Sequence, residues 1–327
     1  MSRTTGWVLL ALVLAAAVLA GLALGSASIA PADVWQALRG EGPQTTRTII
    51  WSLRVPRVAA AALVGASLAV SGVIFQALLR NPLAEPYLLG VSSGAAAGAV
   101  AALVLGLTWL GHAGVTLFAL VGALLAIVVV FAVARGSGHL DTRVLILAGV
   151  VVAAFFGACV MLLLTFARGD TLRSAVLWTM GSLGGVRPTM IPVLGATAAA
   201  GLAGAFALAR DLNALSLGEE PAAQLGTSVE RTKLAAYLLA SLLAAAAVAT
   251  AGVIGFIGLV VPHAVRILWG GDHRHLVPMA FVGGALALVL ADTVARTVAP
   301  PLEIPVGVIT ALAGVPLFLI LLRRRAA

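Results

Sequence analysis

Long stretches without a charged residue constrain this sequence more than any other feature. A helix needs about 20 apolar residues to cross the hydrocarbon core of a bilayer, and ten stretches meet that need. They cover residues 8–27, 58–79, 88–107, 115–134, 144–166, 190–209, 234–251, 252–269, 277–294 and 304–322. The sequence therefore predicts an all-α polytopic membrane protein with about ten transmembrane helices, in a single domain over residues 1–327.

The composition agrees with a place in the lipid bilayer. Hydrophobic residues make up 61% of the 327 and charged residues 10%, whereas a soluble domain has about 45–50% and about 25%. The stretch 8–27 also has features of a signal peptide, because it follows Arg3 and ends in small residues. We expect it to be retained, since ten spans place both termini, including the final Arg323–Arg325, in the cytoplasm.

The chain is basic, with 20 Lys and Arg against 12 Asp and Glu, or a formal charge of +8. Such an excess can indicate a nucleic-acid partner, but basic residues also gather in the cytoplasmic loops of membrane proteins. We therefore expect no nucleic-acid partner. Ten spans put 12 of the 20 basic residues in cytoplasmic segments and eight outside, so the outer face is unusually basic and needs an explanation of its own.

Only one of the basic residues is a lysine, Lys233. A nucleotide-binding P-loop needs a lysine after its glycines, and Lys233 stands in Arg-Thr-Lys-Leu instead. If ATP drives this protein, another chain must hydrolyse it. The sequence shows no triad spacing, carboxylate pair or metal-ligand motif, and His263 has no second ligand nearby, so we expect neither an enzyme nor a metal or cofactor site.

The longest polar interruption covers residues 210–233. Within it, Pro221 can open a short helix and Gly226 can end it. A short helix exposed to the cytoplasm would offer a docking surface for a partner. An ordinary solvated loop is the alternative that the pattern leaves open.

Two segments of the chain resemble each other at a shift of 180 residues. Residues 69–82 align with 249–262 and share Ala, Gly, Val, Ile, Leu and Pro at six positions. The copies begin in the second and seventh spans, so they cross the membrane in opposite senses. The alignment predicts an inverted repeat of helices 2–5 and 7–10, a plan common in transport proteins, although alanine-rich spans also match by chance.

Both copies contain a predicted helix break. Asn81–Pro86 holds two prolines around a polar core, and residues 234–265 are uncharged but too long for one span. Gly252, Gly255 and Gly258 recur there and either break the helix or pack it closely. Irregular backbone at membrane depth is tolerated only where protein or a water-filled cavity satisfies it, so the breaks point to a pathway.

Seven segments together carry a resemblance to a known family. They are Arg54-Val-Pro-Arg57, Gly65-Ala-Ser-Leu-Ala-Val-Ser-Gly72, Gln76, Asn81-Pro-Leu-Ala-Glu-Pro86, Leu89-Gly-Val-Ser-Ser-Gly94, Gly252-Val-Ile-Gly-Phe-Ile-Gly258 and Val261-Pro-His263. In combination, and over nearly the whole chain, they resemble the FecCD-type permeases. These are the membrane subunits of bacterial ABC importers for cobalamin, ferric siderophores and haem.

The resemblance implies a set of partners in the cytoplasmic (inner) membrane. A second copy of the chain, two ATPase subunits carrying ATP and Mg²⁺ on the cytoplasmic side, and a substrate-binding protein outside would complete the importer. Arg54, Arg57 and Arg296 match family arginines that pair with glutamates of the binding protein, and complementary charge sets the register of such a complex. For Arg54 and Arg57, anchoring to lipid headgroups is the alternative.

The resemblance also implies two cytoplasmic elements. The ATPase-coupling residues would be Leu217, Gly218, Glu219, Glu220, Ala222, Ala223, Leu225 and Gly226, with the two alanines allowing close contact. The cytoplasmic gate would be formed by Asn81, Leu83, Asp141 and Thr142. The last two depart from the pair of small hydroxyl residues in the cobalamin permease.

Substrate and driving force are predicted from fewer residues. Residues 178–183 are more similar to iron-chelate and haem permeases than to the cobalamin one, which favours haem or another iron chelate and leaves cobalamin open. An ion-coupled secondary transporter is the main rival, but it needs ionisable groups within its spans, and only Asp292 qualifies. Arg296 follows one helical turn later, so the spacing predicts an ion pair between the two at the outer end of the ninth span. A passive channel or scaffold is the second rival.

Overall fold

Each of the ten predicted spans forms a helix. The computed structural model describes residues 3–25, 28–107, 112–136 and 139–326. Its elements are α1 (Arg3–Ala23), α2 (Pro31–Leu38), α3 (Gln44–Thr48), η1 (Ile49–Arg54), α4 (Val55–Leu78), η2 (Pro86–Leu89), α5 (Val91–Val104), α6 (His112–Ala134), β1 (Arg135–Gly136), β2 (His139–Leu140), α7 (Thr142–Phe166), α8 (Gly169–Thr179), η3 (Pro188–Met190), α9 (Ile191–Ala207), α10 (Ala209–Leu217), α11 (Glu219–Gln224), α12 (Val229–Ala251), α13 (Ile257–Trp269), α14 (His273–Thr297) and α15 (Val306–Ala326).

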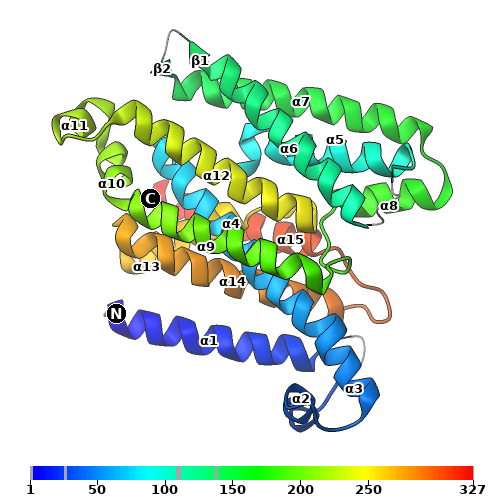
Figure 1. Ribbon diagram of the computed structural model, residues 1–327. Coiled ribbons are helices and arrows are strands. Elements are labelled where there is room, and N and C mark those ends of the chain that lie inside the picture. The colour runs from blue at the N-terminus through cyan, green and yellow to red at the C-terminus, as the bar shows by residue number, and fades with distance from the viewer. Residues whose placement is uncertain (1–2, 26–27, 108–111, 137–138, 327) are drawn as a thin grey trace.

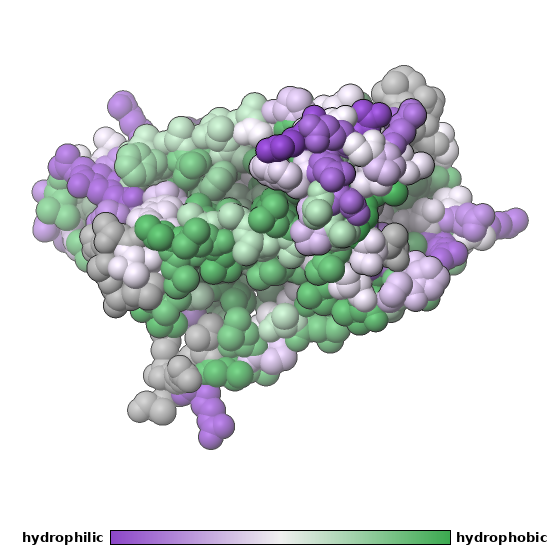
Figure 2. Space-filling view, turned by 90° about the horizontal axis from the view of Figure 1, so that it is seen from below, coloured by the Kyte–Doolittle hydropathy of each residue, from purple (hydrophilic) through white to green (hydrophobic). Residues whose placement is uncertain are grey.

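Length and apolarity divide these helices into two groups. Seven described segments are long and apolar enough to cross a membrane, and three shorter apolar helices lie over Val91–Val104, Ile257–Trp269 and Val306–Ile320. Together they match the ten predicted stretches. On the face drawn in Figure 2, hydrophobic residues fill much of the middle, and hydrophilic residues gather at the left and right ends and in a patch at the upper right. A broad hydrophobic surface is expected for a protein that spans a bilayer.

The long helices run side by side, so the molecule has two distinct ends (Figure 1). We call one the α11 end; it holds α10, α11, the β1–β2 hairpin and both chain termini. The other, the α2 end, holds α2, α3 and α8. The two termini therefore share an end, as the even number of spans predicts.

The inverted repeat is visible as the same pattern of helices occurring twice. A long helix of 24 residues, α4, is followed by a break and the 14-residue α5. Likewise α12 has 23 residues and is followed by a break and the 13-residue α13. The helices α4 and α12 pack together and run in opposite directions (Figure 1). The second break occupies residues 252–256, so the predicted span 252–269 begins as irregular backbone and becomes helical at Ile257.

Glycines bring several helices into backbone contact across the core. A Cβ on Gly72 of α4 would lie 1.8 Å from the carbonyl oxygen of Gly258 in α13. A Cβ on Gly65 would lie 2.2 Å from the carbonyl oxygen of Gly284 in α14. Helices in lipid gain little from the hydrophobic effect and rely on such close van der Waals packing. These contacts hold α4 at the centre of the bundle.

Gly72→Ala tests this packing. Because the added methyl group meets a backbone oxygen, we expect the free energy of unfolding to fall by about 1–3 kcal/mol, measured by thermal unfolding in detergent. The matched control is Gly157→Ala on α7, where a Cβ meets nothing within 4 Å. Equal melting temperatures for the two variants would contradict the packing assignment.

Candidate functional site

A buried carboxylate organises the charges at the α2 end. Asp292 of α14 has a side chain that is 1% exposed, and its two oxygens lie 3.0 Å from Arg57 Nε and 3.0 Å from Arg296 Nε. Arg57 also places Nη1 2.8 Å from Glu303 Oε2, in the segment before α15. This cluster ties α4, α14 and the start of α15 together. The predicted Asp292–Arg296 pair is confirmed.

The end of α1 is held by two of the arginines that were predicted to dock a partner. Arg54 Nη1 donates to the carbonyl oxygens of Leu22 at 2.6 Å and Ala23 at 2.7 Å. Arg296 Nη2 donates to the carbonyl oxygen of Gly21 at 3.0 Å. The last carbonyls of a helix lack helical partners and carry the negative end of its dipole. The two guanidinium groups therefore cap α1.

This capping changes what the three docking arginines present to a partner. Arg54 and Arg296 are 6% and 4% exposed, and the side chain of Arg57 is 13% exposed. Together they line a cavity of about 400 Å³ with Glu303. Docking by these three arginines stays a prediction, and Arg57 is the most accessible of them.

Other arginines of the outer group lie openly on the surface. Arg39, Arg168, Arg173 and Arg187 are exposed. They are the C-cap of α2, the N-cap of α8, a residue within α8 and the N-cap of η3. From the sequence they counted among the basic residues of the outer face, and no role was predicted for them.

At the α11 end, Glu219 joins three parts of the chain. Its carboxylate lies 3.0 Å from Lys233 Nζ on α12 and 3.6 Å from Arg80 Nη2, just after α4. Lys233 also lies 2.7 Å from Glu230, and its own side chain is only 3% exposed. The single lysine of the sequence therefore fastens α11 to α12. These residues line a cavity of about 330 Å³ together with His139, Leu140, Asp141, Thr142 and Arg143.

The predicted coupling segment forms the short helix α11 with an exposed apolar rim. Leu217 and Leu225 are 69% and 59% exposed, and Glu220 and Ala223 are also exposed. Gly218 and Gly226 bound the helix with φ of +127° and +83°, conformations that favour glycine. Ala222 is fully buried within the chain, so of the two alanines only Ala223 is open to a partner.

The four predicted gate residues occupy two different turns. Asn81 Oδ1 accepts a hydrogen bond from the Leu83 amide at 2.9 Å, which shapes the turn after α4. Asp141 is the N-cap of α7 and accepts from the amides of Arg143 at 2.8 Å and Val144 at 3.3 Å. These bonds lower the pKa of Asp141. They give the carboxylate a capping role at a position where the resemblance to the cobalamin permease implies a small hydroxyl residue.

Thr142 is buried and, with Asp141, lines the cavity beside Glu219. Asn81 and Leu83 do not line that cavity. They lie in the first helix break, directly after Arg80. The structure therefore brings one half of the predicted gate to the Glu219 cavity and the other half to the break. A gating role for the four residues stays a prediction.

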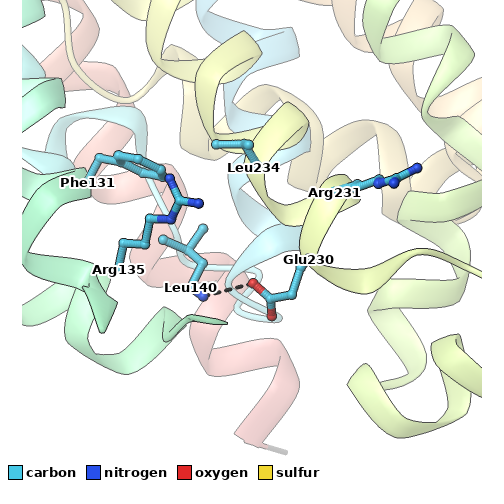
Figure 3. A pocket seen from close by; sticks show the side chains of 6 residues that line it. All are labelled: Phe131, Arg135, Leu140, Glu230, Arg231 and Leu234. Atoms are coloured by element: carbon cyan, nitrogen blue, oxygen red, sulfur yellow. Dashed lines mark hydrogen bonds between the residues drawn. The ribbon is translucent and has the colours of Figure 1, made fainter. Parts of the chain in front are cut away.

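A neighbouring cavity of about 180 Å³ shows how the β1–β2 hairpin is held (Figure 3). The Leu140 amide donates to Glu230 Oε2 at 2.8 Å, and the Arg135 guanidinium lies 5.6 Å from the centre of the Phe131 ring. Glu230 thus bridges the hairpin and Lys233. Glu230 was not predicted from the sequence, although its spacing of three residues from Lys233 on a helix is typical of an ion pair.

The two helix breaks contact each other through side chains of the first. The Phe256 amide donates to Glu85 Oε1 at 2.5 Å. The Ile254 amide donates to the Tyr87 hydroxyl oxygen at 2.5 Å, and that hydroxyl donates to the Ile254 carbonyl oxygen. Glu85 lies within the predicted break at 81–86, whereas Tyr87 was not selected from the sequence.

Metal-ligating side chains do not cluster in the described part of the chain. No group of three or more His, Cys, Asp or Glu residues there is placed to hold a metal ion. The charged residues form two ion-pair clusters instead, one at each end of the molecule.

Comparison with known proteins identifies the family. The model of the FecCD transport family matches residues 12–324. The chain belongs to the FecCD transport family. It is 47% identical to the cobalamin import system permease protein BtuC of Halobacterium salinarum, over 86% of this chain and 75% of that protein. It is 42% identical to the hemin transport system permease protein HmuU of Yersinia pestis, over 93% of this chain and 92% of that one.

A solved structure supports the same conclusion. The fold matches a metal-chelate type ABC transporter in an inward-facing conformation, with a TM-score of 0.85 and 31% identity over 98% of this chain and 99% of that one. The protein is therefore a multi-pass permease of the ABC importer type. Membership of this family of transport subunits agrees with the expectation that the chain is not an enzyme, and it implies ATPase and binding-protein partners and dimerisation.

Asp292→Ala tests the charge cluster at the α2 end. Removing the carboxylate leaves Arg57 and Arg296, both largely buried, without their shared ion-pair partner. We therefore expect the free energy of unfolding to fall by about 3–5 kcal/mol. Thermal unfolding in nanodiscs measures the loss. Glu303→Gln is the control, because its side chain is 43% exposed and such pairs contribute about 0–1 kcal/mol. If Glu303→Gln lowers the free energy of unfolding as much as Asp292→Ala does, Asp292 is not the residue on which the cluster depends.

Proposed function

We propose that this chain is the translocation subunit of an importer for a bulky metal chelate, and that it works by alternating access. Two copies form the pathway, and two ATPase subunits, which carry ATP and Mg²⁺, drive it from the cytoplasmic side. A substrate-binding protein delivers the chelate from outside. The contact of Glu219 with Lys233 and Arg80 carries this proposal, because it links an exposed helix to Arg80, directly before the first break, and to α12, which leads to the second.

The α11 end suits an ATPase partner. Leu217 and Leu225 present exposed apolar side chains on either side of α11, and buried apolar side chains commonly form the core of an interface. Behind them, Glu219 joins Lys233 of α12, which leads to the second break, and Arg80, which precedes the first. A displacement of α11 would therefore reach both breaks. Energy supplied outside the membrane needs such a mechanical link.

The α2 end suits an acidic binding protein. Arg54, Arg57 and Arg296 outnumber the carboxylates of Asp292 and Glu303 in their cluster, and exposed arginines stand at α2 and α8 of the same end. Complementary charge speeds encounter and sets orientation. We propose that Arg57 and its exposed neighbours meet the binding protein, while Arg54 and Arg296 support that surface by holding α1 in place.

The same reasoning orients the chain in the cytoplasmic membrane. Both termini lie at the α11 end (Figure 1), and 12 of the 20 basic residues were assigned to that side. The positive-inside rule places the more basic loops in the cytoplasm. We therefore propose cytoplasmic termini and an outward-facing α2 end.

The substrate is proposed by class. Residues 178–183 favour haem or another iron chelate, including a ferric siderophore, and the 42% identity to a hemin permease supports it. Cobalamin is the second candidate, supported by the 47% identity to a cobalamin permease. All are large ligands, and in this scheme the binding protein supplies the affinity.

Uptake into proteoliposomes tests the function. The chain is reconstituted with its ATPase and binding protein, and haem, a ferric siderophore and cobalamin are offered in parallel. We expect uptake of one of them to require ATP and the binding protein and to be blocked by vanadate. Uptake driven by an ion gradient without ATPase would establish a secondary transporter, and vanadate-insensitive equilibration would establish a channel.

Glu219→Gln tests the mechanical link. The amide keeps the size of the side chain but removes the charge that attracts Lys233 and Arg80, so we expect several-fold less substrate moved per ATP with the ATPase still bound. The measurement is the ratio of uptake to phosphate release. Arg274→Gln, an exposed residue at the start of α14, is the control. An unchanged ratio in Glu219→Gln would remove Glu219 from the coupling route.

A further inference from the structure

The two inverted halves of the chain meet at their helix breaks. Glu85 and Tyr87 from the first break bind the backbone of Ile254 and Phe256 in the second. We call these hydrogen bonds the break contact. The residues it joins are separated by 167 to 171 positions in the sequence. The contact therefore joins repeat to repeat rather than neighbours along the chain.

The second break depends on this contact for its polar groups. Residues 252–256 are not helical, and Gly252 and Phe256 have positive φ values of +71° and +69°. A positive φ is costly for a phenylalanine, so the surrounding structure must hold it. Tyr87 satisfies both the amide and the carbonyl of Ile254, and Glu85 satisfies the amide of Phe256. Lipid offers no such partners.

Close packing around the break contact opposes sliding of the first break past the second break and α13. A Cβ on Gly258, which follows the second break, would lie 2.7 Å from Pro86 Cδ of the first. Gln76 near the end of α4 places Nε2 3.4 Å from the Leu259 carbonyl oxygen and accepts from Arg266 Nη1 of α13 at 3.0 Å. The end of α4, both breaks and α13 are thus joined by hydrogen bonds and backbone contact.

We propose that Glu85 and Tyr87 are positioning residues that fasten the two helix breaks into one rigid body. This body keeps its internal contacts while it moves as a unit between the outward-open and inward-open states. Motion that reaches either break then moves both. The movement between the two states rests on the proposed function, whereas the break contact is present in the isolated chain. The two are therefore tested separately.

Amide hydrogen exchange tests the break contact on the purified full chain. We expect the Ile254 amide to exchange at least about tenfold faster in Tyr87→Phe, and the Phe256 amide in Glu85→Ala, since each loses its acceptor. The only other tyrosine, Tyr237, donates to the Ile127 carbonyl oxygen at 2.9 Å, so Tyr237→Phe is the matched control. If these amides exchange as fast in the wild type as in the variants, the proposal is overturned. This test needs only the isolated chain and no ATPase.

The rigid body is tested in the assembled importer. With the ATPase bound, exchange at Ile254 and Phe256 should be the same in the nucleotide-free and vanadate-trapped states. If either amide exchanges faster in one state than in the other, the break contact opens in that state and the proposal is overturned. If no ATPase binds the chain, the proposed function fails, and the break contact is judged on the isolated chain.

A positioning role also predicts a specific loss of coupling. We expect Tyr87→Phe and Glu85→Ala to move several-fold less substrate per ATP, because the breaks then move independently. Glu85→Gln keeps an oxygen for the Phe256 amide and should retain coupling. Tyr237→Phe should lower the melting temperature as Tyr87→Phe does, yet leave coupling unchanged. Equal coupling in the two tyrosine variants would show that the hydroxyl of Tyr87 is merely structural.

Discussion

Backbone amides and carbonyls at the two helix breaks have to find partners inside the protein, because lipid provides none. That requirement shapes the centre of the molecule. Glu85 and Tyr87 reach from one repeat to satisfy the backbone of the other, and glycines such as Gly72 let the backbones approach closely enough. A membrane protein that interrupts its helices for a pathway must build this support from its own side chains. Here side chains of the first repeat complete the backbone hydrogen bonding of the second.

The ion pairs of the described residues are concentrated at the two ends of the bundle. At the α2 end, Arg54 and Arg296 cap α1, and Asp292 neutralises part of the cluster. At the α11 end, Glu219 and Lys233 join the short exposed helix to the long α12. Buried charges are retained only where pairing offsets their desolvation. The proposed partner surfaces therefore rest on ion pairs that also hold the helices together.

Local sequence patterns predicted the parts of the fold that local physics determines. Uncharged runs located the helices, prolines and glycines located both breaks, and the Asp292–Arg296 spacing predicted their pair. The contacts of Arg54 were not predictable, because its acceptors lie on α1, more than 30 positions away. The same holds for Tyr87 and Ile254. Such pairs depend on which helices become neighbours.

One further outcome comes from the tertiary fold in the same way. A glycine-bounded helix at 219–224 was predictable from Pro221 and Gly226, but which alanine faces the protein was not, and Ala222 is the buried one. Asp141 is a local case instead: where the resemblance to the cobalamin permease implies a small hydroxyl residue, its carboxylate caps α7.

The decisive experiment is a structure of the chain bound to its ATPase, in nucleotide-free and vanadate-trapped states. We expect the ATPase to lie against Leu217 and Leu225 at the α11 end. We also expect Glu85 to stay within hydrogen-bonding distance of Phe256 in both states. An ATPase bound at the α2 end, or a Glu85 separated from Phe256 in either state, would contradict this mechanism.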